Sequence, residues 1–219
     1  RLPMGVIVVS GTNGKTTTVG MLGAMLRAAG ENAVEVGNIG LPICEAIDTD
    51  ATVFAVELSS FQLHTVSTVS PLASVCLNVD ADHLDWHGSA QAYAADKAKV
   101  YHLTQKACFY PASDITVENM VAEADVVEGA RAIGLTLGIP SISQVGWVED
   151  ALVERAFIEK RHMQAQFLAE VDDLRVAYHD GVTDAARMDA TAAAGLARAF
   201  GVPPEAVAQG LRSFTPAHH

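Results

Sequence analysis

Residues 6–17 constrain this chain most, because they read as a strand, a glycine-rich loop and the start of a helix in direct succession. Residues 6–9 are a run of apolar, β-branched side chains, which is typical of a buried parallel strand. Two glycines then bracket a tight loop, and a helix is predicted to begin at Lys15. Backbone N–H groups and the positive end of a helix attract an anion, and glycine lets the backbone approach it closely. The pattern therefore predicts a phosphate-binding loop made of Gly11, Thr12, Asn13, Gly14, Lys15, Thr16 and Thr17.

The residues that follow the second glycine predict how this loop would bind a nucleotide. Lys15 would place its charge on the terminal phosphates, and the Thr16 hydroxyl would bind a Mg²⁺ ion. The strict eight-residue motif has its first glycine where this chain has Val9. The alternative is an ordinary glycine-rich turn with a solvated lysine, but it does not explain why Lys-Thr-Thr follows Gly14 directly.

The rest of the chain alternates between short apolar runs and helical patterns. We expect strands at 32–36, 52–56, 73–79, 107–110 and 132–137, a hairpin at the sheet edge within 146–159, and helices at 42–47, 89–103, 114–124, 184–200 and 204–214. Strands that alternate with helices through short loops indicate a parallel sheet. The predicted fold is a doubly wound, mostly parallel α/β sheet with flanking helices.

The composition of the chain limits which binding partners and which cellular compartment we expect. A net charge of -12 and a pI near 4.9 argue against nucleic acid or an anionic membrane as the main partner. No apolar run is long enough to span a bilayer, and no secretory leader is visible, so we expect a cytoplasmic protein. We also expect it to be a monomer. Cys44, Cys76 and Cys108 are expected to be buried, reduced thiols. The missing initiator methionine indicates a fragment, and the final histidines could be native or a tag.

Polar side chains follow several of the predicted strands at their carboxyl ends. Thr16, Asn38, Glu57 and His83 each come after a different strand, and ligands of open parallel sheets bind at that edge. Hydroxyl, carboxylate and imidazole groups together predict a site for a hard cation and phosphate. A buried carboxylate such as Glu57 is costly unless it is paired or binds metal.

Each of these residues also has an ordinary explanation. Glu57 could be a cap or a surface charge, and His83, between two aspartates, could be a solvated loop residue. Asn38 lies between glycines and could form a turn with positive φ. Their joint position at successive strand ends beside a phosphate loop favours a site.

Taken in order, these motifs resemble those of a known family. The segments at 11–17, 37–40, 57–63 and 77–85 are similar to the ATPase domain of the Mur ligases, and the resemblance covers essentially the whole chain, most closely 5–101. The loop alone is shared with folylpolyglutamate and cyanophycin synthetases, whereas the ordered set of motifs is more specific. The sequences Glu-Leu-Ser-Ser-Phe-Gln-Leu and Asp-His-Leu-Asp-Trp-His-Gly are most similar to those of the family member that adds D-glutamate to UDP-N-acetylmuramoyl-L-alanine.

The resemblance implies an ADP-forming amide ligase of peptidoglycan synthesis. In this family ATP converts a carboxylate into an acyl phosphate, and an amine then displaces the phosphate. By resemblance Lys15 holds the β- and γ-phosphates, Thr16 and Glu57 bind one Mg²⁺, and His83 with Glu57 binds a second. Asn38 and Ser59 would line the reacting centre.

The resemblance also implies a carbamylated lysine, which corresponds to Lys97. Carbon dioxide on the neutral amine makes a carboxylate that can bind Mg²⁺, which an ammonium group cannot do. Lys99 is the alternative assignment. From helical periodicity alone, both lysines are predicted to be exposed.

The chain departs from the family in one motif and in extent. The family has His-Asn-x-x-Asn-Ala, whose asparagines contact adenine, where residues 185–190 read Ala-Ala-Arg-Met-Asp-Ala. Asp189 replaces the second asparagine, so either Thr183 or Asp184 supplies other contacts or nucleotide affinity is reduced. We expect residues 1–219 to form a single central ATP-binding domain without the family's N-terminal UDP-binding and C-terminal domains, and so to be incomplete for turnover.

Other functions remain open at this point. A related ligase that adds another amino acid would share the motifs, and an inactive Mur-like nucleotide-binding module would fit the altered 185–189 segment. A small-molecule kinase would share the loop, but it does not explain the motifs at 57–60 and 82–85 together.

Overall fold

The computed structural model describes residues 5–80 and 87–216. The strands are β1 (Gly5–Ser10), β2 (Ala33–Gly37), β3 (Val53–Glu57), β4 (Ala73–Cys76), β5 (Ala107–Pro111), β6 (Arg131–Leu135), β7 (Gln144–Val148), β8 (Ala151–Glu154) and β9 (Gln166–Glu170). The helices are α1 (Lys15–Ala28), α2 (Ile43–Ala46), α3 (Ser60–Thr65), α5 (Ala90–Ala98), α6 (Ile115–Ala122), α7 (Asp172–Arg175), α8 (Asp184–Phe200) and α9 (Pro204–Ser213), with a 3-10 turn, η1, at Lys99–Tyr101.

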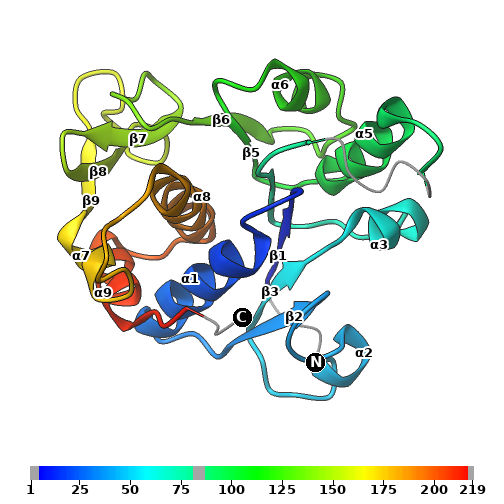
Figure 1. Cartoon of the computed structure of the whole chain (residues 1–219), viewed down its shortest axis with the longest axis horizontal. Helices are drawn as coiled ribbons and strands as arrows, with labels where there is room; N and C mark the ends of the chain where they lie inside the picture. The colour runs from blue at the N-terminus through cyan, green and yellow to red at the C-terminus, as the bar shows by residue number, and fades with distance from the viewer. Residues whose placement is uncertain (1–4, 81–86, 217–219) are drawn as a thin grey trace.

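The strands form one sheet in the order β2-β3-β1-β4-β5-β6-β7-β8-β9 (Figure 1). Neighbours from β2 to β7 are parallel, whereas β7, β8 and β9 pair antiparallel. Strand β1 lies between β3 and β4, so the ends of these three strands meet where the chain enters the glycine-rich loop. The predicted doubly wound, mostly parallel sheet with flanking helices is confirmed.

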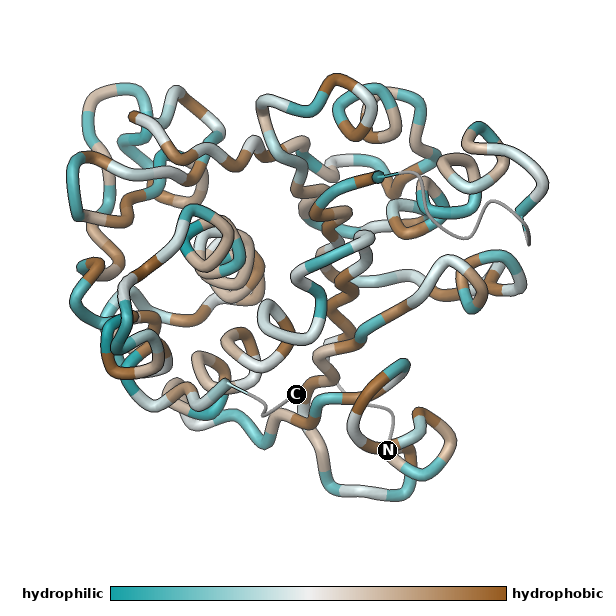
Figure 2. The backbone as a smooth tube through the Cα atoms, in the orientation of Figure 1, coloured by the Kyte–Doolittle hydropathy of each residue, from teal (hydrophilic) through white to brown (hydrophobic). Residues whose placement is uncertain are grey.

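Helices cover both faces of the sheet. Helices α1, α8 and α9 pack on one face with Ile7 and Val9 of β1, and α2, α3 and α6 pack on the other with Val8 (Figure 1). Successive residues of a strand point to opposite faces, so a strand buried on both sides is apolar throughout. Figure 2 shows this as hydrophobic colour along the central strands.

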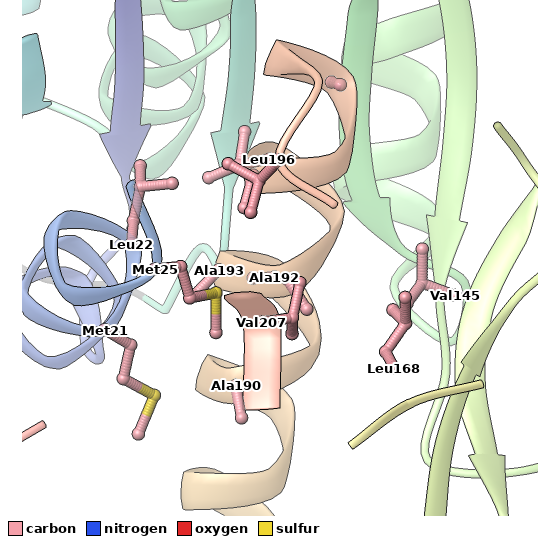
Figure 3. Close-up of a cluster of buried hydrophobic side chains, with 14 of the residues drawn as sticks. Met21, Leu22, Met25, Val145, Leu168, Ala190, Ala192, Ala193, Leu196 and Val207 are labelled. Carbon is pink, nitrogen blue, oxygen red and sulfur yellow. The ribbon is translucent and has the colours of Figure 1, made fainter. Parts of the chain in front are cut away.

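Helix α8 lies inside the core rather than on its surface. Its residues Ala190, Ala192, Ala193 and Leu196 are buried, because alanine lets neighbouring elements approach closely. Figure 3 shows these side chains among residues from four other elements, which are Met21, Leu22 and Met25 of α1, Val207 of α9, Val145 of β7 and Leu168 of β9. The same helix therefore packs against the parallel and the antiparallel parts of the molecule.

Most predicted elements are found, with three corrections to elements and one to a cysteine. The strand predicted at 73–79 ends at Cys76, and the helix predicted at 89–103 ends at Ala98 and continues as η1. The hairpin within 146–159 exists as β7–β8 but is not at the edge, because β9 pairs outside it. Cys44 is exposed, whereas Cys76 and Cys108 are buried free thiols. No helix within the described residues is long and apolar enough to cross a membrane.

Candidate functional site

The glycine-rich loop connects β1 to α1 as predicted. Gly14 is the N-cap of α1 and has φ +83°, a left-handed conformation that favours glycine. A Cβ at this position would also overlap Oδ1 of Asp189, so the residue must be glycine for two reasons. No acidic residue lies in the first turn of α1, whose positive end attracts an anion, but the Asp189 carboxyl of α8 lies beside its N-cap Gly14.

A residue that the sequence analysis did not select, Asn78, fixes the shape of this loop. Its Oδ1 accepts hydrogen bonds from the backbone N–H of Thr12 (2.8 Å) and of Asn13 (2.9 Å), and its Nδ2 donates to Asn13 O (3.2 Å). Asn78 follows β4 in the structure, and the strand-end rule missed it because the predicted strand extended to residue 79. These three hydrogen bonds constrain the backbone of the loop at Thr12 and Asn13.

Three of the predicted residues meet at the end of β3. The Thr16 hydroxyl donates to Oε2 of Glu57 (2.9 Å), and Nδ2 of Asn38 donates to Oε1 of the same carboxylate (3.0 Å). Glu57 is only 1% exposed, so the explanation as a surface charge is wrong. Asn38 is not among the residues with positive φ, so it is not a left-handed turn former. The structure therefore brings Thr16, Asn38 and Glu57 together beside the loop.

Two lysines donate hydrogen bonds to backbone carbonyl oxygens of the loop. Nζ of Lys15 donates to Thr12 O at 2.9 Å, which keeps its charge at the loop. Lys97 is 2% exposed, and its Nζ donates to Gly11 O at 2.6 Å. The expectation from periodicity that Lys97 is exposed is wrong, because α5 packs this face against the end of β1. Lys99 has a half-exposed side chain and pairs with Asp96, so Lys97 is the lysine at the site.

Tyr93 links Lys97 to the loop and was also missed by the sequence analysis. Nζ of Lys97 lies 5.1 Å from the centroid of its ring, and its hydroxyl shares a hydrogen bond of 3.0 Å with the Thr12 hydroxyl. An aromatic face attracts a cation, so the ring stabilises a charged lysine at this position. One helical turn of α5 thus contributes two side chains to the loop.

The buried carboxylate of Asp96, in α5, lies in a cluster of polar side chains. Asp96 accepts hydrogen bonds from His64 (2.9 Å), His87 (3.0 Å) and Lys99 (2.8 Å), and His87 also contacts the Ser60 hydroxyl at 3.0 Å. Burial would raise the pKa of the Asp96 carboxyl, but the hydrogen bonds from Lys99 and the two histidines outweigh burial and hold the pKa below its ordinary value. This cluster joins α3 to α5.

Ser59 and His83 are the remaining predicted site residues. Ser59 is the N-cap of α3, where its hydroxyl and the Gln62 side chain form a capping box. His83 lies outside the described residues. Within the described ranges, no three His, Cys, Asp or Glu side chains gather as a metal site. A metal ion held by Thr16 and Glu57 would therefore need other groups as its remaining ligands.

Asp189 is the residue of the altered motif that reaches the loop. It lies in α8 beside Gly14, and burial raises the pKa of its carboxyl to about 7, although the nearby Thr18 hydroxyl opposes the shift. The two other candidates lie elsewhere, since Thr183 uses its hydroxyl to cap α8 and Asp184 is exposed.

A cavity of about 360 Å³ opens beside the start of α1. Thr16 and Thr17 form one wall, and the aromatic rings of Tyr178 and Phe214 form part of the others. Ligand cavities of proteins typically measure about 300–1,000 Å³ and combine apolar rings with a few polar groups. The cavity is therefore large enough for part of a ligand whose phosphates lie at the loop.

The chain is similar in sequence to known proteins. A model of the Mur ligase middle domain family matches residues 9–136. The chain is 50% identical over its whole length to UDP-N-acetylmuramoylalanine–D-glutamate ligase of Streptomyces coelicolor, of which it spans 46%. It is 45% identical, over 97% of its length and 45% of the relative, to the ligase of the same name from Thermobifida fusca. The chain thus spans about half the length of these relatives.

Solved structures show the same fold at low identity. The structure of a MurF ligase from Thermotoga maritima in complex with ADP aligns with a TM-score of 0.67 and 16% identity, over 99% of this chain and 49% of that one. At this identity the match supports the fold alone.

Proposed function

The chain belongs to the Mur ligase middle domain family, and from this premise we propose that it is the central ATP-binding part of an ATP-dependent ligase that joins D-glutamate to UDP-N-acetylmuramoyl-L-alanine in peptidoglycan synthesis. The remaining parts of the protein would bind the UDP-sugar and the amino acid. We propose in addition that the enzyme is a monomer and is located in the cytoplasm.

One observation carries the proposal. The phosphate loop, a buried carboxylate with a hydroxyl neighbour, and a buried lysine come from different strands and helices, yet they meet at one end of β1. An ordinary glycine-rich turn needs neither Glu57 nor Lys97 beside it. Burial of both charged groups costs free energy unless they bind a ligand or pair with each other.

The donor set fits a hard cation. Within the described part of the chain, Glu57 is bound by a hydroxyl and an amide but forms no ion pair, so its buried charge is not neutralised. Oxygen ligands of this kind suit Mg²⁺, which Thr16 and Glu57 would hold. When bound, Mg²⁺ would supply positive charge to the phosphates of the nucleotide.

The residues of the chain have separate tasks in the proposed reaction. The carboxylate of the acceptor attacks the γ-phosphorus of ATP, the bond to the bridging oxygen breaks, and ADP leaves. The amine of D-glutamate then attacks the acyl phosphate, and phosphate and a proton leave as the amide forms. Lys15 and the N-terminus of α1 stabilise the phosphate charge, and Asn38 orients Glu57. Ser59 and His83 remain proposed members of the reacting centre.

Lys97 is the proposed site of carbamylation. Its neutral amine would add CO₂ and release a proton, which replaces a cation by a carboxylate beside the loop. Its burial and its contact with Gly11 O support this choice over Lys99. The carbamate, with His83, would contribute to a second Mg²⁺ site.

The decisive experiment compares two lysine variants of the full-length protein. ADP release is measured with Mg·ATP, UDP-N-acetylmuramoyl-L-alanine and D-glutamate. We expect Lys15→Ala to lower kcat/KM by about 100-fold or more, because removing one preorganised charge at a developing oxyanion costs about 3–4 kcal/mol. The matched control is Lys106→Ala, which removes an exposed lysine outside the site.

Other outcomes would identify the alternatives. Equal activity of Lys15→Ala and the unmodified protein would contradict the phosphate-loop assignment. Turnover only with an amino acid other than D-glutamate would indicate a related ligase. Nucleotide binding without turnover on any acceptor would indicate an inactive module.

A further inference from the structure

The carboxyl group of Asp189 packs directly against the phosphate loop. Its Oδ1 lies so close to Gly14 that a Cβ on this glycine would overlap it, and α8, which is part of the core, carries Asp189. A nucleotide whose phosphates occupy this loop would therefore have a carboxyl group as a close neighbour. Two negative groups at such a short separation repel each other strongly in a partly buried site.

The groups that face Asp189 do not neutralise it. Within residues 5–80 and 87–216 it forms no ion pair, and Lys15, the cation of the loop, donates to Thr12 O instead. Arg187 of the same helix pairs with Asp150 and lies over the Trp147 ring. Tyr178 faces Asp189 from the segment after α7, and burial together with the Asp189 charge raises the pKa of its hydroxyl, so it offers a neutral group.

The first turns of α1 add a polar but uncharged neighbour. The Thr18 hydroxyl is fully buried and makes no hydrogen bond of normal geometry within the described residues. It lies close enough to Asp189 to oppose the rise in the pKa of that carboxyl, but burial dominates. The carboxyl thus sits in a desolvated position where its neutral form is accessible near pH 7.

We propose that Asp189 couples nucleotide binding to the uptake of one proton, so that the nucleotide binds to the protein in which this carboxyl is neutral. The inference rests on the proposed function, since it assumes that a triphosphate occupies the loop. The neutral carboxyl removes the repulsion, and its O–H becomes a donor toward the ligand. Asp189 then determines how tightly the nucleotide binds at a given pH.

The sign of the pH dependence follows from the linkage of protons and ligand. Below the pKa of about 7, Asp189 is already protonated and binding takes up no proton at this group. Above it, binding must bring a proton to the carboxyl, so affinity falls by up to a factor of about ten for each pH unit. Between pH 6 and pH 8 the expected fall is about tenfold.

The experiment is a calorimetric titration of the full-length protein and of Asp189→Asn with Mg·ATP at pH 6 and pH 8. Asparagine keeps the size of the side chain but cannot ionise. We expect the ratio of the two dissociation constants to change by about tenfold between these pH values, with Asp189→Asn the tighter binder at pH 8. Because both proteins titrate the same ATP and Mg²⁺, the ionisation of the nucleotide cancels in this ratio.

Proton uptake provides a second readout. At pH 8, titrations in buffers of different ionisation enthalpy should show close to one more proton bound by the unmodified protein than by Asp189→Asn. Glu205→Gln is the matched control, because it removes an exposed carboxylate from α9 and should behave like the unmodified protein. If Asp189→Asn does not fold, Asp189→Ser gives the same comparison with a smaller side chain.

The outcomes separate the inference from the proposed function. Parallel pH dependence in the unmodified protein and Asp189→Asn, or weaker binding by the variant at both pH values, would overturn the proton coupling and leave the nucleotide site intact. Absence of Mg·ATP binding by either protein at any pH would overturn the proposed function, and the inference with it.

Discussion

At Asp96, a single carboxylate determines how two helices are joined. Its two oxygens accept hydrogen bonds from one lysine and two histidines, and its side chain is only 10% exposed. Hydrogen bonds to a charged group contribute more than neutral ones, and a buried donor that loses its partner is costly. The residue next to it, Lys97, reaches the loop, so the position of α5 and the geometry of the site depend on the same contact.

Replacing this carboxylate should destabilise the protein in a pH-dependent way. We expect Asp96→Asn to lower the free energy of unfolding by about 2 kcal/mol at pH 7, because the charge-assisted hydrogen bonds are lost. The pKa of Asp96 is below its ordinary value of 3.8, so its stabilisation is present above about pH 4 and is lost as the pH falls through the lower, folded value.

Urea unfolding at pH 7 and at pH 3 would measure this difference between the unmodified protein and Asp96→Asn. The difference between the two proteins should be largest at pH 7 and smaller at pH 3, because the stabilisation is lost progressively below the ordinary pKa of 3.8. The matched control is Asp172→Asn, whose exposed pair with Arg175 should matter by less than about 0.5 kcal/mol. A difference that does not shrink on acidification would mean that the charge of Asp96 contributes nothing.

Single residues also show what could be predicted of the site from the sequence. Thr16, Glu57 and Lys15 could be located because they follow strands or glycines, and local spacing determines where such residues lie. Tyr93, Asp96 and the burial of Lys97 could not, because they depend on how α5 docks on the end of β1. Periodicity of a short alanine-rich helix does not indicate which face is covered.

Among the elements, α1 and α9 approach each other closely at Gly210. A Cβ at Gly210 would lie 2.5 Å from the Met25 Cα, which is backbone and cannot move aside. Glycine is therefore required by packing, although it disfavours a helix interior by about 1 kcal/mol relative to alanine. The contact sets the distance between two helices that cover the same face of the sheet.

We expect Gly210→Ala to lower the free energy of unfolding by about 1–3 kcal/mol, since the overlap with α1 outweighs the better helix propensity of alanine. Thermal unfolding followed by circular dichroism would measure it. The control is Gly138→Ala, because a Cβ there meets only the Thr136 hydroxyl at 3.7 Å. A stabilised Gly210→Ala variant would show that α9 can move away from α1 without cost.

Elements were predicted well where a local signal marks both ends. The bounds of α8 agree with the prediction, because an alanine-rich run is capped by Thr183 and stopped at Gly201, which has φ +116°. Strand β9 and helix α7 were missed, because β9 is half-exposed at the sheet edge and α7 is a single turn. Such short elements are stabilised by their neighbours rather than by their own sequence.

For the whole molecule, the question is whether the antiparallel strands unfold together with the parallel sheet. One cluster of buried side chains runs from Ile7 of β1 to Leu168 of β9. Two polar contacts reinforce it, since Trp147 of β7 donates to the Thr191 hydroxyl of α8 at 2.8 Å, and Arg198 of α8 pairs with Glu154 of β8 at 3.2 Å. A core shared in this way predicts a single cooperative unfolding transition.

Glu154 tests this continuity, because its fully buried carboxylate connects β8 to α8 and to the turn that follows β8. One oxygen pairs with Arg198, and the other accepts the N–H groups of Ala156 (2.6 Å) and Phe157 (2.8 Å). We expect Glu154→Gln to lower the free energy of unfolding by about 3 kcal/mol, because Arg198 is left largely buried without its counter-charge.

The number of unfolding transitions tests the shared core more directly than the midpoint temperature does. Differential scanning calorimetry should show one peak at a lower temperature for Glu154→Gln, with calorimetric and van't Hoff enthalpies still equal. The pair of Arg187 with the exposed Asp150 provides the control, since Asp150→Asn should change the midpoint little. Two resolved peaks in Glu154→Gln would mean that β7–β9 form a separate cooperative unit, and that α8 holds two units together rather than lying in one core.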